Sequence, residues 1–380
     1  MSHLKYKVLL VSHYTEVPGV MEKVASFLEG QDFHLSYILN PLFPRSDLKS
    51  IIKSRNVDIK YKLPWYGQYL IEGIVGYFKF KYSVKQISSL DLAVCFDPLS
   101  FLEMIAFKKL LRIKKVVYYN VDYSTRRYKN IALNFIYNCM NKFAYVKSDY
   151  FLSLSRKYIE DIDPGKKYAS KSFLLRHTVS LGDYQNVKKI PNSLVYAGSL
   201  SRTVNFSDFL LSLHDLKEEG IDFTCDIYGQ GDQLKSIQKL TSELSLSNRV
   251  NFKGVVSHDV LTRNVLPKYI IGVCPYIKKG TKVEADHMFT GTDLTTKLVE
   301  YLAAKLPIVT TELYDAFRAV EQNQIGFLVK NQHDWHMSLK KLLSDRLLQE
   351  KYSENAYEYS KNYDENMVLG PVFKHMLGEG

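Results

Sequence analysis

The feature of this sequence that most limits its fold is a series of apolar strands that alternates with helix-like stretches and then starts again. Five segments rich in Val, Leu, Tyr and Phe are predicted strands: 6–14, 33–39, 90–96, 114–121 and 148–155. Periodic stretches between them are predicted helices, at 20–29, 100–112 and 129–146. A second strand series follows at 192–200, 223–229, 249–255, 270–276 and 306–311. Each series predicts βα units around a parallel sheet.

The division between the two series is predicted at residues 182–192, a polar stretch that contains Pro191. A chain of 380 residues is long for one core and typical of two domains. We therefore predict an α/β protein with domains at 1–187 and 188–350 and a helical tail at 351–380. Parallel sheets bind ligands beyond the carboxyl ends of their strands, so a cleft is expected where the two domains face each other.

Composition places the chain among folded soluble proteins, with 46% hydrophobic and 24% charged residues. The sequence has no run of about 18 uncharged apolar residues, as a membrane span requires, and the start resembles a strand rather than a signal peptide. A cytoplasmic location is expected. The four cysteines, at 95, 139, 225 and 274, lack the paired spacing of a zinc or redox site and are expected to be buried and reduced.

The positive charge lies in the first half of the chain. Residues 1–185 contain 28 Lys/Arg and 16 Asp/Glu, whereas the remainder contains 23 and 24, so the net charge divides as +12 and −1. A basic domain favours an anionic partner such as nucleic acid, acidic lipid or a pyrophosphate-linked acceptor. Solvated lysines with no partner are the alternative.

Residues 292–311, TDLTTKLVEYLAAKLPIVTT, join a polar turn to a short helix and a β-branched strand. Free backbone N–H groups at a helix start can bind phosphate. Glu300 lies on the second turn of the predicted helix, within reach of hydroxyls just beyond such a phosphate. An ordinary α/β crossover is the alternative.

This segment resembles the sugar-donor signature of GT-B glycosyltransferases, in particular the retaining family 4 type, glycosyl transferases group 1. The later glutamate of that signature corresponds to Glu300, followed by the matching 301–304 and Pro307. The earlier glutamate falls on Thr292, and the adjacent Asp293 offers a shorter carboxylate. Further segments resemble the family in order and spacing: 194–202, 226–233, 250–256 and 323–329.

The resemblance implies that the second domain binds a nucleotide sugar without a metal, and that the tail crosses back onto the first domain. Arg202, Lys297 and backbone N–H groups of Thr295 and Thr296 are the candidates for the diphosphate, and Glu300 for the ribose hydroxyls. A surface position is the alternative for Lys297 and for Glu300. The implied sugar-donor residues are Gly19, Gly198, Arg202, Gly229, Val255, Asp293, Thr295, Thr296, Lys297 and Glu300.

The first domain is the implied acceptor domain. The family often has histidines after later strands of this domain, where this chain has Asp97, Asn120 and Asp122. These three are the catalytic candidates, because a carboxylate there can orient an acceptor hydroxyl or act as a base; a strand-end cap is the alternative for the aspartates. Retention of configuration is implied by the resemblance alone, and a retaining front-face mechanism needs no base. His177 is expected at the cleft or in a hinge hydrogen bond.

Two aromatic and basic stretches, 61–85 and 126–147, favour the membrane interface, with burial of both in the core as the alternative. The expected partners are thus a nucleotide sugar, a glycan or lipid-pyrophosphate-linked acceptor and an anionic membrane surface, with no nucleic acid. The function predicted is glycosyl transfer in surface polysaccharide biosynthesis. A sugar-nucleotide epimerase and a noncatalytic GT-B partner subunit are the other interpretations.

Overall fold

A computed structural model describes residues 6–14, 19–31, 33–41, 49–54, 57–62, 70–83, 89–121, 127–128, 130–182, 187–277, 293–313 and 315–379. The chain forms two compact units. Unit 1 comprises the described residues up to Arg176 together with those from Glu365 onward, and unit 2 comprises His177–Asp364. The first division lies between Arg176 and His177, about ten residues before the division predicted from the sequence, between residues 187 and 188.

Unit 1 is built on an eight-stranded sheet in the order β4-β3-β2-β1-β5-β6-β7-β8. Its strands are β1 (Tyr6–Tyr14), β2 (Phe33–Pro41), β3 (Ser50–Ser54), β4 (Val57–Tyr61), β5 (Leu90–Cys95), β6 (Ile113–Asn120), β7 (Tyr150–Ser153) and β8 (Ser172–Leu174). All pairs are parallel except β2–β3 and β3–β4, which make an antiparallel edge. The five predicted strands are confirmed; β3, β4 and β8, of three to five residues, were not predicted.

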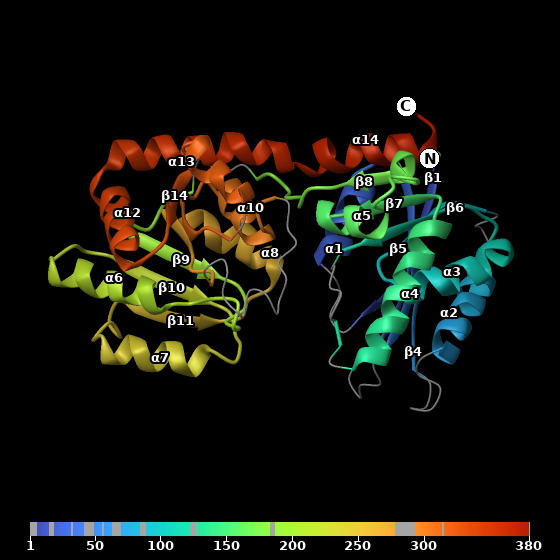
Figure 1. Cartoon of the computed structure of the whole chain (residues 1–380), viewed down its shortest axis with the longest axis horizontal. Helices are drawn as coiled ribbons and strands as arrows, with labels where there is room; N and C mark the ends of the chain where they lie inside the picture. Colours follow the sequence, from blue (N-terminus) through green and yellow to red (C-terminus); the bar gives the residue numbers. More distant parts are fainter. Residues whose placement is uncertain are drawn as a thin grey trace. The chain divides into compact units, whose positions relative to one another are not determined.

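Alternate side chains of β1 enter two different cores, because successive residues of a strand point to opposite faces of the sheet. Leu9 and Val11 pack in the core that helices α2 to α5 cover, and Val8 and Leu10 pack in the core under α1 and α14. Figure 1 shows these helices beside the sheet. The helices are α1 (Gly19–Glu29), α2 (Leu70–Ser83), α3 (Pro98–Leu111), α4 (Ile131–Lys147), α5 (Arg156–Ile162) and α14 (Glu365–Leu377), with a short turn η2 (Ala169–Lys171).

Unit 2 contains a six-stranded, wholly parallel sheet in the order β11-β10-β9-β12-β13-β14. Its strands are β9 (Ser193–Ala197), β10 (Thr224–Tyr228), β11 (Val250–Gly254), β12 (Ile271–Cys274), β13 (Ile308–Thr311) and β14 (Gly326–Val329). Its helices are α6 (Ser207–Glu218), α7 (Leu234–Glu243), α8 (His258–Val260), α10 (Thr296–Ala303), α11 (Ala319–Gln322), α12 (Gln332–Ser344) and α13 (Arg346–Ser360), with shorter turns η3 (Leu261–Val265), η4 (Leu266–Lys268), η5 (Asp315–Arg318) and η6 (Lys361–Tyr363). The predicted second strand series is confirmed.

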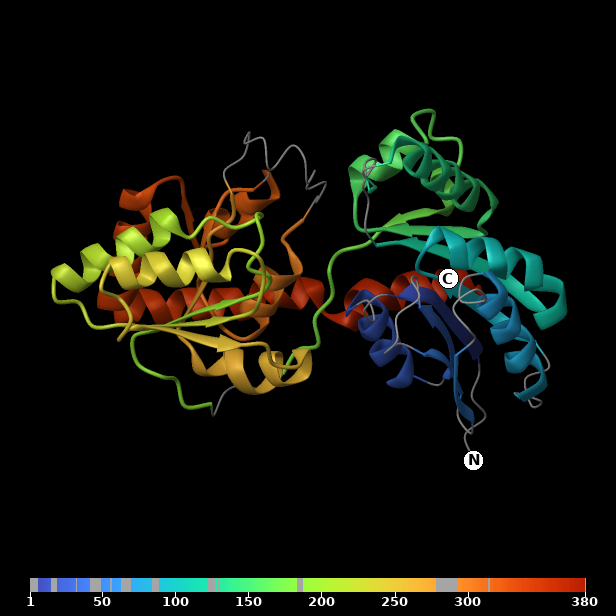
Figure 2. The same cartoon turned by 90° about the horizontal axis from the view of Figure 1, so that it is seen from below.

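The last two helices belong to different units (Figure 2). Helix α13 contacts α10 and α12 in unit 2. Helix α14 packs Leu369, Phe373 and Met376 into the core of unit 1 that also contains side chains of α1. The chain therefore returns to its first unit after completing the second.

Three of the four cysteines are buried, as predicted, but Cys139 on α4 is exposed, so that part of the prediction is wrong. Most residues of α4 before it are exposed as well, because this helix meets the core mainly through Ala144 and Tyr145 near its carboxyl end. In the part of the chain that the structure describes, no helix is both long enough and apolar enough to cross a membrane.

Candidate active site

Both sheets have a point at which the strand order reverses. In unit 1 it lies between β1 and β5, and in unit 2 between β9 and β12. Neighbouring connections diverge to opposite faces at such a point and leave a crevice beyond the carboxyl ends of the strands, where α/β proteins bind ligands.

Gly198, directly after β9, approaches the side chain of Lys297 closely. It has a φ of +152°, and a Cβ at this position would lie 2.5 Å from Lys297 Cε. Gly229, after β10, is equally constrained, since its Cβ would overlap the carbonyl of Gly198. The Gly229 N–H donates to the carbonyl of Gly254 at 2.7 Å. Glycines thus let the turns after β9, β10 and β11 pack together. Val255, which follows Gly254 at the end of β11, is exposed.

Lys297, on the first turn of α10, is surrounded by aromatic groups. Its Nζ donates to Tyr196 Oη at 3.0 Å and lies 4.2 Å from the centre of that ring and 5.2 Å from the ring of Tyr276. Ring faces and a hydroxyl oxygen stabilise a cation but do not neutralise its charge. Among the described residues, no carboxylate lies within ion-pair distance of Lys297. A half-buried cation of this kind attracts an anion.

The amino terminus of α10 adds backbone donors beside Lys297. Thr295 is the N-cap residue, and its side chain makes no capping hydrogen bond. Its Oγ1 instead lies 2.8 Å from Tyr276 Oη, and Thr296 Oγ1 lies 2.9 Å from His177 Nδ1. The helix dipole and the first N–H groups favour negative charge at this end. Lys297 and the helix start therefore form one anion-attracting cluster with Gly198.

Glu300 lies one turn further along α10, with only 9% of its side chain exposed. His258 Nε2 donates to Glu300 Oε1 at 2.7 Å. Just before α10, Asp293 Oδ1 accepts from Tyr363 Oη at 2.5 Å and from the Leu294 N–H at 2.8 Å. The site thus has two carboxylates at fixed positions near the helix start. Thr292 lies outside the described residues.

Arg202 lies beyond the turn after β9 and is mostly exposed. Its Nε is 3.5 Å from Asp232 Oδ2, with 73% of the arginine side chain exposed. The structure thus gives Arg202 a carboxylate partner, which Lys297 lacks among the described residues.

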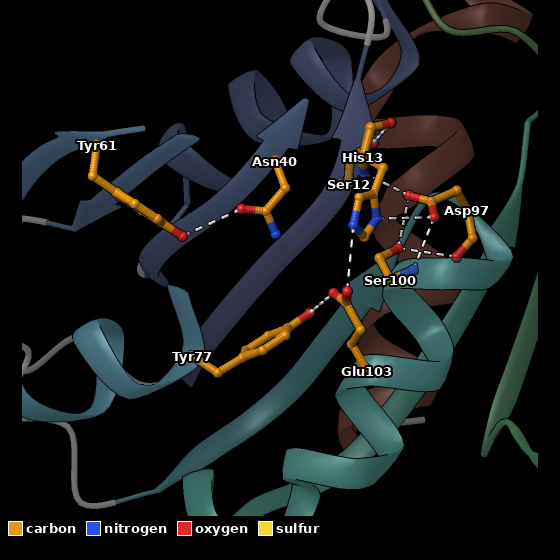
Figure 3. Close-up of polar contacts among 8 residues, drawn as sticks. All are labelled: Ser12, His13, Asn40, Tyr61, Tyr77, Asp97, Ser100 and Glu103. Carbon is orange, nitrogen blue, oxygen red and sulfur yellow. Dashed lines mark hydrogen bonds and ion pairs between the residues drawn. The ribbon is translucent and has the colours of Figure 1, made fainter. Parts of the chain in front are cut away.

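The strand reversal of unit 1 contains a buried charged network (Figure 3). His13, near the end of β1, places Nδ1 3.3 Å from Asp97 Oδ1 and Nε2 3.4 Å from Glu103 Oε1. Tyr77 Oη donates to the other oxygen of Glu103 at 3.0 Å. Burial alone would lower the pKa of His13, but the two carboxylates outweigh it and raise the pKa to about 10. His13 is thus a cation at neutral pH.

Asp97 is the N-cap residue of α3. It accepts from the Ser100 N–H at 2.8 Å, from Ser100 Oγ at 2.8 Å and from the His13 N–H at 2.7 Å. Burial alone would raise the pKa of Asp97, but the His13 charge and these hydrogen bonds hold the pKa below its ordinary value. Its catalytic role stays a prediction, and the contacts give it a structural role.

Two further candidates of unit 1, Asn120 and Gly19, lie at the ends of elements of the same unit. Asn120, at the end of β6, donates from Nδ2 to Tyr118 Oη at 3.1 Å and to Asn141 Oδ1 at 3.2 Å. Gly19 is the first residue of α1, with open space where a Cβ would be. Asp122 lies outside the described residues. The described residues include no group of three His, Cys, Asp or Glu side chains arranged to bind a metal.

Several residues of these clusters were not found from the sequence. Glu103 and Tyr77 carry no local signal, since they meet His13 from other elements. His13 carried a local signal, because it lies near the end of the first predicted strand, at the same sheet edge as Asp97. His258 follows a predicted strand in the same way.

Comparison with known proteins defines the class. Residues 184–359 match the sequence model of the family described as glycosyl transferases group 1. The whole chain is similar to the sucrose-phosphate synthase of Thermosynechococcus elongatus, at a TM-score of 0.66, 13% identity and coverage of 99% of this chain and 100% of that one. Anabaena HepE, solved in complex with UDP, gives a TM-score of 0.65 at 13% identity, covering 98% and 100%. WaaG, a glycosyltransferase involved in lipopolysaccharide biosynthesis, gives 0.57 at 15% identity, also covering 98% and 100%.

These similarities show the GT-B fold for the chain and a group 1 glycosyltransferase domain in its second half. The protein is a glycosyl transfer enzyme. No curated protein sequence matches the chain.

Proposed function

We propose that the protein transfers a sugar from a nucleotide-sugar donor bound in unit 2 to a glycan or lipid-linked oligosaccharide, in bacterial-type surface polysaccharide biosynthesis. The observation that carries the proposal is Lys297, a half-buried cation without a carboxylate partner in the described part of the chain, beside Gly198 and the start of α10. A diphosphate supplies the missing negative charge.

The chemical step needs stabilisation of the nucleoside diphosphate as its bond to the sugar breaks. Lys297 and the first N–H groups of α10 are fixed before the reaction and so stabilise that charge without reorganisation. We therefore expect no metal cofactor. Glu300 binds the ribose hydroxyls, and Asp293 faces the transferred sugar in place of the family's first glutamate.

We further propose that the configuration is retained, as in the family 4 type that the sequence resembles. The leaving phosphate then takes the proton of the acceptor hydroxyl, and no carboxylate base is required. The contacts of Asp97 support this, because a carboxylate with a lowered pKa and several hydrogen bonds is a weak base.

A cytoplasmic protein that binds the inner face of the membrane fits the surface of unit 1. Helix α4 exposes Ile131 (86%), Leu133 (51%), Phe135 (68%) and Ile136 (53%). These side chains belong to the half of the sequence with a net charge of +12. Exposed apolar side chains on a helix of a basic domain are suited to an anionic lipid surface, where a lipid-pyrophosphate acceptor would be found.

Lys297→Met tests the sugar-donor site. Its dissociation constant for UDP, GDP or ADP, whichever the wild type binds, is expected to rise about 10- to 100-fold, as for loss of a hydrogen bond to a charged group. Binding of the corresponding nucleoside, which lacks phosphate, is expected to be unchanged. Calorimetry measures both, and Lys268→Met, an exposed lysine of the same unit, is the control.

The outcomes separate the three interpretations. Wild-type protein that binds none of these nucleotides contradicts the proposed site and favours a noncatalytic partner subunit. Binding with transfer of labelled sugar to lipid-linked acceptors supports the proposal, whereas conversion of the free nucleotide sugar to its epimer identifies an epimerase.

Liposome flotation tests the membrane surface. The double variant Phe135→Ser/Ile136→Ser is expected to bind vesicles containing anionic lipid less than the wild type. Leu347→Ser, which removes an 80% exposed leucine of α13, is the matched control and is expected to have no effect. A wild type that binds neither anionic nor neutral vesicles would overturn this part of the proposal.

A further inference from the structure

His258 connects two parts of the sugar-donor site that are far apart in the sequence. It is the first residue of α8, just after the turn that follows β11. The Val260 N–H donates to Ser257 Oγ at 3.5 Å, and the chain continues from α8 into a π-helical turn at Leu261–Val265. π-helical turns occur often at functional sites. The backbone at His258 is thus part of a helical start and not of an unstructured loop.

The imidazole is directed at the carboxylate of Glu300. The distance of 2.7 Å from His258 Nε2 to Glu300 Oε1 is short, as for hydrogen bonds to charged acceptors. The two side chains differ in exposure, at 51% for His258 and 9% for Glu300. A carboxylate removed from water to this extent needs hydrogen-bond donors at defined positions.

We propose that His258 is a positioning residue, which orients the Glu300 carboxylate for the ribose and thereby sets the preference of the site for a ribonucleotide. The inference rests on the proposed function of unit 2. A glutamate side chain has three rotatable bonds, and fixing them costs free energy when a ligand binds. With Oε1 bonded to His258, that orientation is set before the nucleotide arrives.

The two oxygens of a carboxylate together accept about four hydrogen bonds, so the bond from His258 does not by itself exclude further donors. The ribose hydroxyls are hydrogen-bond donors of the right chemistry. The effect of His258 on binding should therefore appear only with ligands that carry those hydroxyls. A residue that merely stabilised unit 2 would affect all ligands alike.

The experiment compares nucleoside diphosphates with their 2′,3′-dideoxy counterparts by calorimetry, using whichever of UDP, GDP or ADP binds the wild-type chain. The wild type is expected to prefer the ribonucleotide. In His258→Leu that preference should fall about ten-fold, while the dideoxy ligand binds as before. His258→Gln, whose amide N–H can replace Nε2–H, should restore most of the preference.

His336→Gln is the matched control, because His336 Nε2 pairs with Glu219 at 3.1 Å elsewhere in unit 2. It should leave the preference unchanged. A His258→Leu variant that keeps the wild-type preference would overturn the inference, as would equal weakening of both ligands. A wild type that binds no nucleoside diphosphate would instead contradict the proposed function itself, so the two failures are distinguishable.

Discussion

The two strand reversals of this protein occupy equivalent places in their sheets but differ in how their charges are arranged. At the reversal of unit 1, the His13 cation lies between Asp97 and Glu103, with a carboxylate at ion-pair distance from each ring nitrogen. At the reversal of unit 2, Lys297 has only hydroxyl and ring partners among the described residues. The same topology thus serves the stability of the fold in one unit and leaves a charge for a ligand in the other.

Removal of the central cation should therefore affect the two reversals in opposite ways. His13→Ala leaves the buried Glu103 and the largely buried Asp97 without their counter-charge and is expected to destabilise unit 1 by about 3–5 kcal/mol. Lys297→Met removes a charge that has no carboxylate partner in the described structure, and should change stability far less while it weakens nucleotide binding. Urea unfolding followed by probes of each unit measures both, because a two-unit chain need not unfold in one step.

His34→Ala is the control for the first variant, since His34 lies in the same sheet and its Nε2 lies 2.9 Å from the hydroxyl of Ser54. His34→Ala should lower the free energy of unfolding of unit 1 clearly less than His13→Ala does. If His13→Ala and His34→Ala both cause an equally small loss of unfolding free energy, the proposed difference between the two reversals is wrong.

The pH dependence of stability should show the same contrast. Because the pKa of His13 is raised from 6.5 to about 10 by folding, its contribution is complete below pH 6.5 and is lost as the pH rises toward 10. Because folding lowers the pKa of Asp97 from 3.8, the stabilisation that Asp97 contributes through His13 is also lost as the pH falls below that value. The free energy of unfolding of unit 1 should thus be greatest between about pH 4 and 6.5.

Urea unfolding at a series of pH values measures this curve. In His13→Gln the decline between pH 6.5 and 10 should be much smaller, since glutamine does not titrate. A wild-type curve that is flat across this interval would show that His13 is not held as a cation.

The sequence predicted the parts of this molecule that local patterns determine. The strands of both series have apolar runs long enough to recognise, and Gly198, Lys297 and Glu300 follow strands or lie on one short helix. β3 and β4 escaped prediction because each has five residues, partly charged, at the edge of the sheet. The His13–Glu103 and His258–Glu300 pairs join residues 90 and 42 positions apart, and only the folded chain brings them together.

The sharpest test of the cluster in unit 2 comes from Gly198→Ala. The new Cβ would meet the end of the Lys297 side chain, which is flexible and can move, so stability should fall by only about 1–3 kcal/mol, mainly from the positive φ. The affinity for the nucleotide should also fall, because the new Cβ displaces the ammonium group of Lys297. Gly220→Ala is the matched control, because Gly220 has a φ of +73° and open space around it. It should share the loss of stability and keep the affinity. If Gly198→Ala also keeps its affinity, the position of Lys297 beside the glycine turn does not determine binding, and the difference between the two reversals would have to lie in the start of α10.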